Sequence, residues 1–269
     1  SELVRVVFTC TGSESNDLAL RIARLVSGNE GVIVTSYAYH GTSATVAAVS
    51  PNLGVAVKLS PSVRMVNLPG PGGVPDDHAA EFFEAEVRTA ITDLQRRGIG
   101  VAALLFDSIF SSDGVWIDPP GFIVGAVAAI REAGGLVIAD EVQPGFGRTG
   151  SHMWGFERHG IVPDLVTLGK PMGNGFPIGA VVGRRHPMDQ FGHSARYSNT
   201  FAGNTVGIAA ADAVLKILQR DRILSSVLAT SQRLRAGLER VAEQGPGIRA
   251  IRNAGQCFGI DICLDGSSA

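Results

Sequence analysis

The segment that most constrains this chain is an apolar strand that ends in two carboxylates, GLVIADEVQ at residues 135–143. Its uninterrupted apolar run predicts a strand that is buried on both faces, as in parallel sheets. A second apolar run, at 164–169, leads directly into Lys170. Because α/β sheets bind ligands beyond the carboxyl ends of their strands, we expect Asp140 and Lys170 to border one site.

A fixed carboxylate beside a reactive amine matches the needs of pyridoxal phosphate. The carboxylate keeps the pyridinium nitrogen protonated, and the lysine carries the aldehyde as a Schiff base. Two other interpretations compete with this one. The pair Asp140-Glu141 is also typical of the metal-site strand of a P-loop NTPase, but the chain contains no GxxxxGK[ST] sequence. A lysine after a strand, taken alone, is more often a solvated surface residue.

Composition narrows the class of protein. The 269 residues are 45% hydrophobic and 18% charged, which permits one large domain or two smaller ones with a sizeable core. The net charge of −2 gives no electrostatic argument for a nucleic-acid or membrane partner. The cysteines (Cys10, Cys257 and Cys263) have neither metal-ligand spacing nor the pattern of a disulfide framework. We therefore expect a cytoplasmic protein with no metal site and no transmembrane segment.

Apolar runs alternate with amphipathic stretches along the chain, which predicts an α/β fold with a mostly parallel, seven-stranded sheet sandwiched by helices. Strands are expected at 3–10, 31–36, 63–68, 101–106, 135–140, 164–169 and 178–183. A long helix at about 221–243 and a strand-like run after it predict a second unit. We expect a large domain at 1–219 and the beginning of a smaller α+β domain at 220–269.

Three further stretches hold candidate ligand contacts. Gly12 and Ser13 open a helix, where free backbone N–H groups favour phosphate, although ordinary helix capping is the preferred explanation for this stretch taken alone. Tyr39 lies in a glycine-closed turn and could stack on a planar ring or simply pack. Arg148, in a glycine-rich loop, could hold an acidic loop or be exposed.

With these residues in view, the chain resembles the class III (subgroup II) aminotransferases of fold type I. The resemblance is collinear from about Val6 to the end and is most specific at 138–150 and 163–170. Three further motifs follow in the family's order, at 12–16, 39–41 and 198–201. Many members have Glu-Pro where this chain has Asp107-Ser108, and that glutamate often pairs with an arginine that takes the substrate carboxylate. Asp107 and Arg148 are therefore the candidate substrate contacts.

The resemblance implies a role for each matched residue. Lys170 would form the Schiff base and then act as general base and acid, and Asp140 would pair with the pyridine nitrogen. Thr200 would reach the cofactor phosphate of a neighbouring subunit, which implies a homodimer. The remaining cofactor contacts would be Val142 and Tyr39 on the two ring faces, Gln143 on the phenolic oxygen, and Gly12 and Ser13 on the phosphate.

The resemblance favours a PLP-dependent aminotransferase that moves an amino group from an amine or amino acid to a 2-oxo acid. Residues 153–156 and 171–175 look closest to the branch that holds alanine–glyoxylate transaminases and the ethanolamine-phosphate and hydroxylysine-phosphate phospho-lyases. The alternative is therefore a PLP-dependent lyase acting on a phosphorylated amino alcohol. A third hypothesis is a chain that is not a competent enzyme, because we expect it to lack the family's N-terminal segment and the rest of the small domain.

Overall fold

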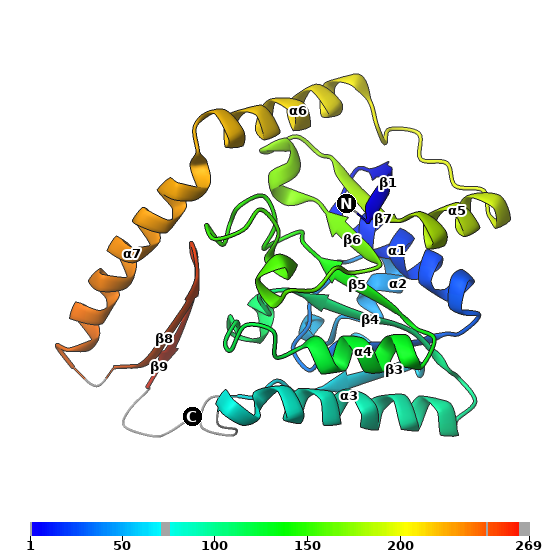
Figure 1. The fold of residues 1–269 in the computed structure, drawn as a ribbon, viewed down its shortest axis with the longest axis horizontal. Coiled ribbons are helices and arrows are strands. Elements are labelled where there is room, and N and C mark those ends of the chain that lie inside the picture. Colours follow the sequence, from blue (N-terminus) through cyan, green and yellow to red (C-terminus); the bar gives the residue numbers. More distant parts are fainter. Residues whose placement is uncertain (1, 71–75, 246, 264–269) are drawn as a thin grey trace.

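The computed structural model describes residues 2–70, 76–245 and 247–263. Within them, a seven-stranded sheet has the order β1-β7-β6-β5-β4-β2-β3 (Figure 1). Its strands are β1 (Leu3–Thr9), β2 (Gly31–Thr35), β3 (Val63–Val66), β4 (Val101–Asp107), β5 (Leu136–Asp140), β6 (Leu165–Leu168) and β7 (Gly179–Arg184). The neighbours from β3 to β6 pair in parallel. The predicted α/β class and mostly parallel sheet are confirmed.

Strand β7 is the exception, because it runs antiparallel to both β6 and β1. Only residues 169–178 separate β6 from β7. A parallel crossover needs a dozen or more residues, so this connection is too short for one. The two reversals leave β1 parallel to β6, and the carboxyl end of β1 therefore lies at the same edge of the sheet as those of β4, β5 and β6.

Helices cover both faces of the sheet (Figure 1). The helices α1 (Gly12–Ser27), α2 (Ala44–Ala47) and α5 (Arg185–Ser194) contribute to one buried cluster, and α3 (Ala79–Arg96) and α4 (Val124–Glu132) contribute to the other. Alternate residues of β5 enter the two clusters: Leu136 and Ile138 pack on the α1 side, and Val137 and Ala139 on the α3 side. An apolar side chain is thus needed at every position, which confirms the prediction of a strand buried on both faces.

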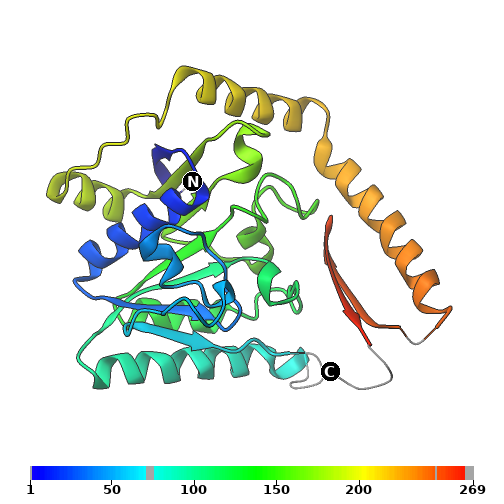
Figure 2. The same cartoon turned by 180° about the vertical axis from the view of Figure 1, so that it is seen from behind.

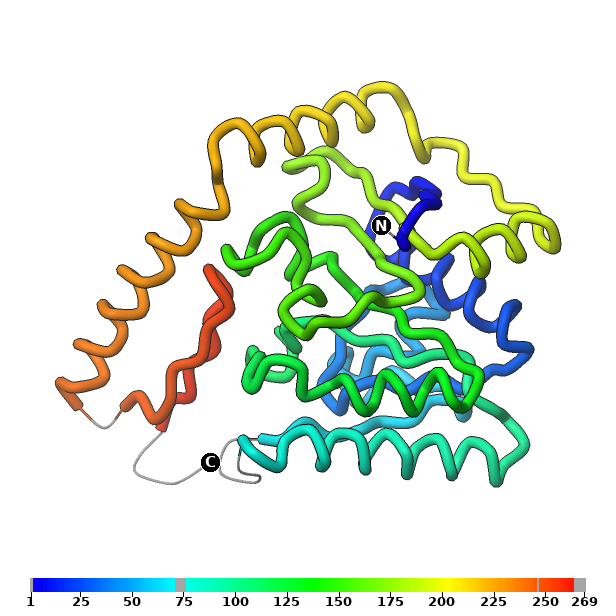
Figure 3. The backbone as a smooth tube through the Cα atoms, in the orientation of Figure 1, coloured from blue at the N-terminus to red at the C-terminus, as the bar shows by residue number. Residues whose placement is uncertain are grey.

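The last part of the described chain stands apart from the sheet. Helix α6 (Thr205–Arg220) leads into α7 (Ile223–Ala242), and the hairpin β8 (Ile248–Ala254)–β9 (Cys257–Ile262) lies between α7 and the body of the fold (Figures 2 and 3). The Arg252 guanidinium fastens the hairpin, because it donates to the Gly114 carbonyl oxygen at 3.0 Å and lies 4.5 Å from the Trp116 ring centroid.

Short 3₁₀ helices complete the fold: η1 (Pro51–Leu53), η2 (Asp76–His78), η3 (Ser111–Asp113), η4 (Gly155–His159) and η5 (Lys170–Gly173). Three of them, η3, η4 and η5, lie in the segments that follow β4, β5 and β6, so irregular backbone gathers beyond the carboxyl edge of the sheet. None of the helices in the described ranges is long and apolar enough to cross a membrane.

Candidate active site

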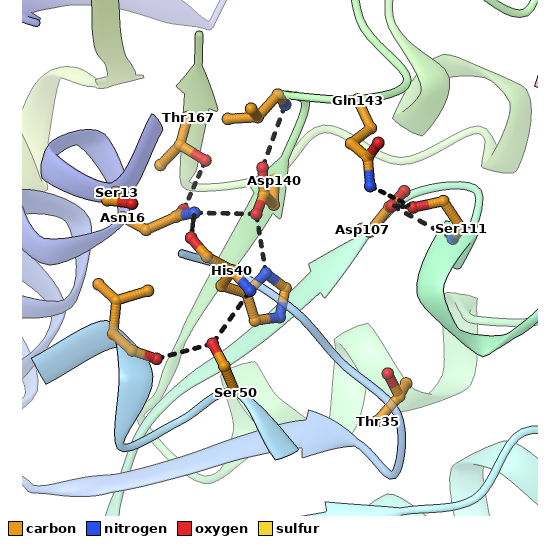
Figure 4. A network of polar contacts seen from close by, with 12 residues as sticks. Ser13, Asn16, Thr35, His40, Ser50, Asp107, Ser111, Asp140, Gln143 and Thr167 are labelled. Atoms are coloured by element: carbon orange, nitrogen blue, oxygen red, sulfur yellow. Dashed lines mark hydrogen bonds and ion pairs between the residues drawn. The ribbon is translucent and has the colours of Figure 1, made fainter. Parts of the chain in front are cut away.

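Asp140, the last residue of β5, is the buried anion at the carboxyl edge of the sheet, with 5% of its surface exposed. Its Oδ2 accepts hydrogen bonds from Asn16 Nδ2 and His40 Nδ1, both at 2.8 Å. Its Oδ1 accepts one from the Val142 backbone N–H at 3.1 Å. Figure 4 shows these donors gathered around the carboxylate. A buried carboxylate needs such donors to offset the loss of water.

The donors to Asp140 are fixed in their orientation. Thr167 Oγ1 donates to Asn16 Oδ1 at 2.7 Å, so the Asn16 amide must turn its NH₂ group toward Asp140. His40 is 3% exposed, and its Nε2 is buried without a partner among the described residues. A carboxylate oxygen only accepts, so the His40 Nδ1–H donates to Asp140, and Nε2 faces no hydrogen-bond partner among the described residues. Asp140 is therefore held by two donors whose own orientation is fixed.

Sequence reasoning did not assign His40, Asn16 or Thr167 a role at the site. Both His40 and Asn16 lie inside matched motifs, and His40 follows Tyr39 directly. Their contacts to Asp140 join residues 100 and 124 positions apart, respectively. Only the pairing of the strands brings these partners together. The available signal was that each is a polar residue in an otherwise buried setting.

Lys170 follows β6 and opens η5, on the strand next to β5. Thr167 is the register partner of Asp140, so Lys170 comes three residues after that pairing. The Lys170 side chain is exposed and makes no hydrogen bond or ion pair within the part of the chain that the structure describes. The sheet thus confirms that the carboxylate and the amine lie at the ends of neighbouring strands, and the amine is free to react.

The N-terminus of α1 approaches the same edge closely. A Cβ added at Gly12 would lie 2.9 Å from the Val142 side chain, and one at Gly169 would lie 3.1 Å from the Gly12 backbone. Thr11 Oγ1 caps the helix by accepting from the Glu14 N–H at 3.1 Å. The N–H groups of Gly12 and Ser13 have no partner among the described residues and remain available to an anion. Capping by Thr11 therefore leaves these two N–H groups open, and their contact with a phosphate stays a prediction.

The turn after β2 packs against the start of α1. Gly41 has a φ of +137°, and a Cβ there would lie 2.3 Å from Ser13 Oγ, so this close approach requires glycine. Ser13 Oγ also accepts from the Thr42 N–H at 3.1 Å. The packing places Tyr39, which is partly buried, two residues from this contact. Its stacking on a cofactor ring stays a prediction.

Asp107 ends β4 directly beside Asp140 in the sheet. Its Oδ1 accepts from the Ile109 N–H at 2.9 Å, and its Oδ2 accepts from the N–H and the hydroxyl of Ser111. Burial raises the pKa of Asp107 to about 6, and these donors oppose that rise. Gln143 Nε2 donates to Ser111 Oγ at 2.8 Å. Asp107 therefore holds the turn after β4, and its contact with substrate stays a prediction.

Two predicted residues lie toward the surface. Arg148 is exposed and, with Phe146, Pro171 and Gln256 among others, lines a cavity of about 280 Å³ beside α6 and α7. Thr200 is also exposed. The residue before it, Asn199, donates to Glu14 Oε2 at 2.9 Å, which holds this segment near the start of α1. The roles predicted for Arg148 and Thr200 remain predictions.

Glu141 points away from the site and has a structural role. It is fully buried and accepts from Ser108 Oγ at 2.6 Å and from the backbone N–H groups of Gly155 and Phe156 at 2.7 and 3.0 Å. These bonds tie η4 to the end of β5. Burial raises the pKa of Glu141 to about 7, and its hydrogen-bond donors oppose that rise.

Replacing Glu141 by glutamine should change how stability depends on pH. A carboxyl whose pKa is raised on folding, here from 4.5 to about 7, stabilises the fold below its unfolded pKa and loses that contribution as the pH rises through about 7. Glutamine does not titrate. Relative to wild type, Glu141→Gln should therefore gain about 3 kcal/mol in free energy of unfolding as the pH rises across this window. Chemical denaturation at a series of pH values measures the difference.

The exposed Glu157 provides a control, because Glu157→Gln should show no such pH-dependent gain. If the difference between Glu141→Gln and wild type were constant with pH, the pKa of Glu141 would not be raised.

Comparison with known proteins agrees with this geometry. The family model described as aminotransferase class-III matches residues 2–268. The ethanolamine-phosphate phospho-lyase homolog 1 of Caenorhabditis elegans is 34% identical over 97% of this chain and 60% of its own length. Among solved structures, a phospholyase from Arthrobacter in complex with phosphoethanolamine superposes with a TM-score of 0.93 at 43% identity, over 99% of this chain and 64% of that one.

A taurine:2-oxoglutarate aminotransferase from Bifidobacterium kashiwanohense, in complex with PLP and glutamate, superposes with a TM-score of 0.85 at 27% identity. That match covers 97% of this chain and 60% of the other. The chain thus spans about 60% of the length of the relatives it matches. The likeness extends over nearly the whole chain, so it includes every site residue described above.

Proposed function

The chain belongs to the class III aminotransferase family, and from that premise we propose that it acts as a PLP-dependent aminotransferase. It would move an amino group from an amine or amino acid to a 2-oxo acid. The observation that carries the proposal is the position of the buried Asp140 carboxyl beside the strand that leads into Lys170, whose amine has no partner among the described residues. A fixed anion and a free amine at one sheet edge are what this chemistry requires.

The residues present fit pyridoxal phosphate. Among the described residues, Asp140 Oδ1 accepts only from the Val142 N–H and retains capacity for a protonated ring nitrogen. The N–H groups of Gly12 and Ser13 offer donors to a phosphate at a helix N-terminus. The glycines at 12 and 169 pack closely at this edge, where the Cβ of any other residue would intrude. Val142, Tyr39 and Gln143 would complete the ring contacts.

The residues of this chain would divide the work as follows. Lys170 Nζ would bind the aldehyde carbon covalently and, once freed by the amine of the substrate, take the proton from the substrate Cα. Asp140 would keep the ring nitrogen protonated, held in place by His40 and Asn16. The cofactor, when bound, supplies the electron sink that makes this Cα–H bond labile. Lys170 would then return the proton to the carbon that had carried the aldehyde. Water would release the first 2-oxo acid, and the same steps in reverse would pass the amino group to a second one.

A phospho-lyase acting on a phosphorylated amino alcohol is the second candidate. It is favoured by the 43% identity to the Arthrobacter phospholyase, which was solved with phosphoethanolamine. The two reactions need the same Asp140 and Lys170, because both begin by loosening a bond at carbon next to the amine. They differ in whether the amino group stays on the cofactor or phosphate leaves the substrate.

Paired assays on the purified protein would separate the candidates. With an amine donor but no 2-oxo acid, an aminotransferase should convert the bound cofactor to its amine form, with lasting loss of the visible band. With phosphoethanolamine, a lyase should release inorganic phosphate over many turnovers and keep the band. Phosphate release without loss of the band would replace the aminotransferase proposal by the lyase. If neither result is obtained with any donor, both proposals are contradicted.

We further propose that residues 1–219 form the large cofactor-binding domain and that residues 220–269 begin a smaller one. The separation of α7 and the β8–β9 hairpin from the sheet supports this division, although residues 246 and 264–269 lie outside the described residues.

The exposure of Thr200 supports a homodimer in which Thr200 reaches the cofactor phosphate of the neighbouring subunit. The three free cysteines support a cytoplasmic location.

A further inference from the structure

Ser111 lies between two candidate site residues that point toward it, Asp107 at the end of β4 and Gln143 after β5 (Figure 4). Its hydroxyl contacts Asp107 Oδ2, and its Oγ is 2.8 Å from Gln143 Nε2. A hydroxyl has one proton to donate, so the direction of these two bonds determines what Gln143 can do.

Asp107 determines the direction of both bonds. Its three hydrogen bonds are all from donors: the Ile109 N–H, the Ser111 N–H and the Ser111 hydroxyl. A carboxylate can only accept, so the Ser111 proton points to Asp107. With that proton committed, Ser111 Oγ can only accept from Gln143. The Gln143 amide must therefore turn its NH₂ group, rather than its oxygen, toward Ser111.

This orientation leaves one N–H of Gln143 without a partner among the described residues. If the Gln143 amide were rotated by half a turn, its oxygen would take the position of this NH₂ group and would repel an anionic ligand oxygen. The hydrogen bonds from Gln143 to Ser111 and from Ser111 to Asp107 all run in one direction. Gln143 therefore presents an N–H group, which carries a partial positive charge, to the site.

We propose that Ser111 is a positioning residue that, anchored on Asp107, holds Gln143 as a hydrogen-bond donor toward the phenolic oxygen of the cofactor. The inference rests on the proposed function, because it concerns the cofactor of that same site. It also assigns Asp107 to this series of hydrogen bonds rather than to pairing with an arginine that takes a substrate carboxylate.

The effect of Ser111→Ala on the bound cofactor tests the proposal. A donor to the phenolic oxygen stabilises the negative charge there and so lowers the affinity of the Lys170-bound nitrogen for its proton. Without the donor, the pH midpoint of the visible absorption change should rise by about one unit. The dissociation constant of apoprotein for pyridoxal phosphate should rise by about tenfold. Spectrophotometric titration and equilibrium dialysis measure the two quantities without an activity assay.

Three variants make the test specific. Ser111→Thr keeps a hydroxyl and should keep the wild-type midpoint. Ser112→Ala removes the neighbouring hydroxyl of η3, which makes no side-chain hydrogen bond in the described ranges, and should also leave the midpoint unchanged. Gln143→Met removes the amide itself and should raise the midpoint as Ser111→Ala does. Adding Ser111→Ala to Gln143→Met should then produce no further rise, because the two residues act in series.

The outcomes separate this inference from the proposed function. A wild-type protein that binds no pyridoxal phosphate would overturn both. The inference alone would be overturned if wild type shows the visible band but the pH midpoint of that band is unchanged in Ser111→Ala or in Gln143→Met. Equal shifts in Ser111→Ala and Ser112→Ala would also overturn it, since the effect would then come from the turn in general. If Ser111→Ala does not fold, the Gln143→Met and Ser111→Thr titrations still decide the question.

Discussion

Lys170→Ala is expected to lower turnover by about ten-thousandfold or more, because it removes both the covalent attachment and the group that moves the proton. The variant should fold as well as wild type, since the side chain is exposed and has no hydrogen bond or ion pair among the described residues. Steady-state kinetics with an amine donor and a 2-oxo acid, at saturating pyridoxal phosphate, measures the loss. Thermal melting of the apoprotein checks the fold.

Lys216→Ala provides the matched control. Lys216 is an exposed lysine on α6 that pairs with Asp212, at 2.6 Å and four residues away. Losing that surface pair should leave turnover unchanged. A small primary amine in the buffer should restore part of the turnover of Lys170→Ala, because it can supply the missing base. Turnover close to wild type in Lys170→Ala would contradict the proposed function.

Asp140→Asn is expected to weaken binding of pyridoxal phosphate by about a hundredfold, or about 3 kcal/mol for one partner of a buried charge pair. Asparagine can still accept from His40 and Asn16 with its oxygen, so the fold should survive. Its NH₂ group would then replace Asp140 Oδ1, where it cannot accept from the Val142 N–H or from a protonated ring nitrogen. Equilibrium dialysis of the apoprotein measures the change in affinity.

A cofactor analogue with carbon in place of the ring nitrogen tests the cause of that loss. Wild type and Asp140→Asn should bind the analogue with similar affinity, because it cannot form the charge pair. Equal losses for the analogue and for pyridoxal phosphate would show that Asp140 acts through the fold rather than through the ring nitrogen. Asp140→Ala should in addition destabilise the protein by about 2–3 kcal/mol, because buried donors of His40 and Asn16 lose their acceptor.

The sequence predicted the strands and the sheet class well, because these depend on local patterns. The apolar run of β5 needs no partner to be recognised as buried on both faces. The antiparallel direction of β7 was not predicted, although the ten residues 169–178 are too few for a parallel crossover. The docking of the β8–β9 hairpin through Arg252 and Trp116 depends on a contact between distant segments, which no local pattern indicates.

The site could be predicted only in part. Asp140 and Lys170 follow apolar strands directly, so their position at the carboxyl edge follows from the topology. Their supporting residues do not stand out in this way, because Asn16 and His40 contact Asp140 only after the sheet has formed. The Ser111 hydroxyl likewise depends on a turn whose geometry is set by Asp107.

The central claim is a covalent link between Lys170 and pyridoxal phosphate, and the most direct test is to trap it. Borohydride reduction of the cofactor-loaded protein, followed by digestion and mass spectrometry, identifies the modified residue. The chain has three lysines, Lys58, Lys170 and Lys216, so the assignment is unambiguous. We predict a pyridoxyl group on Lys170, with Lys58 and Lys216 unmodified. An unmodified Lys170, or labelling spread equally over all three lysines, would contradict the account.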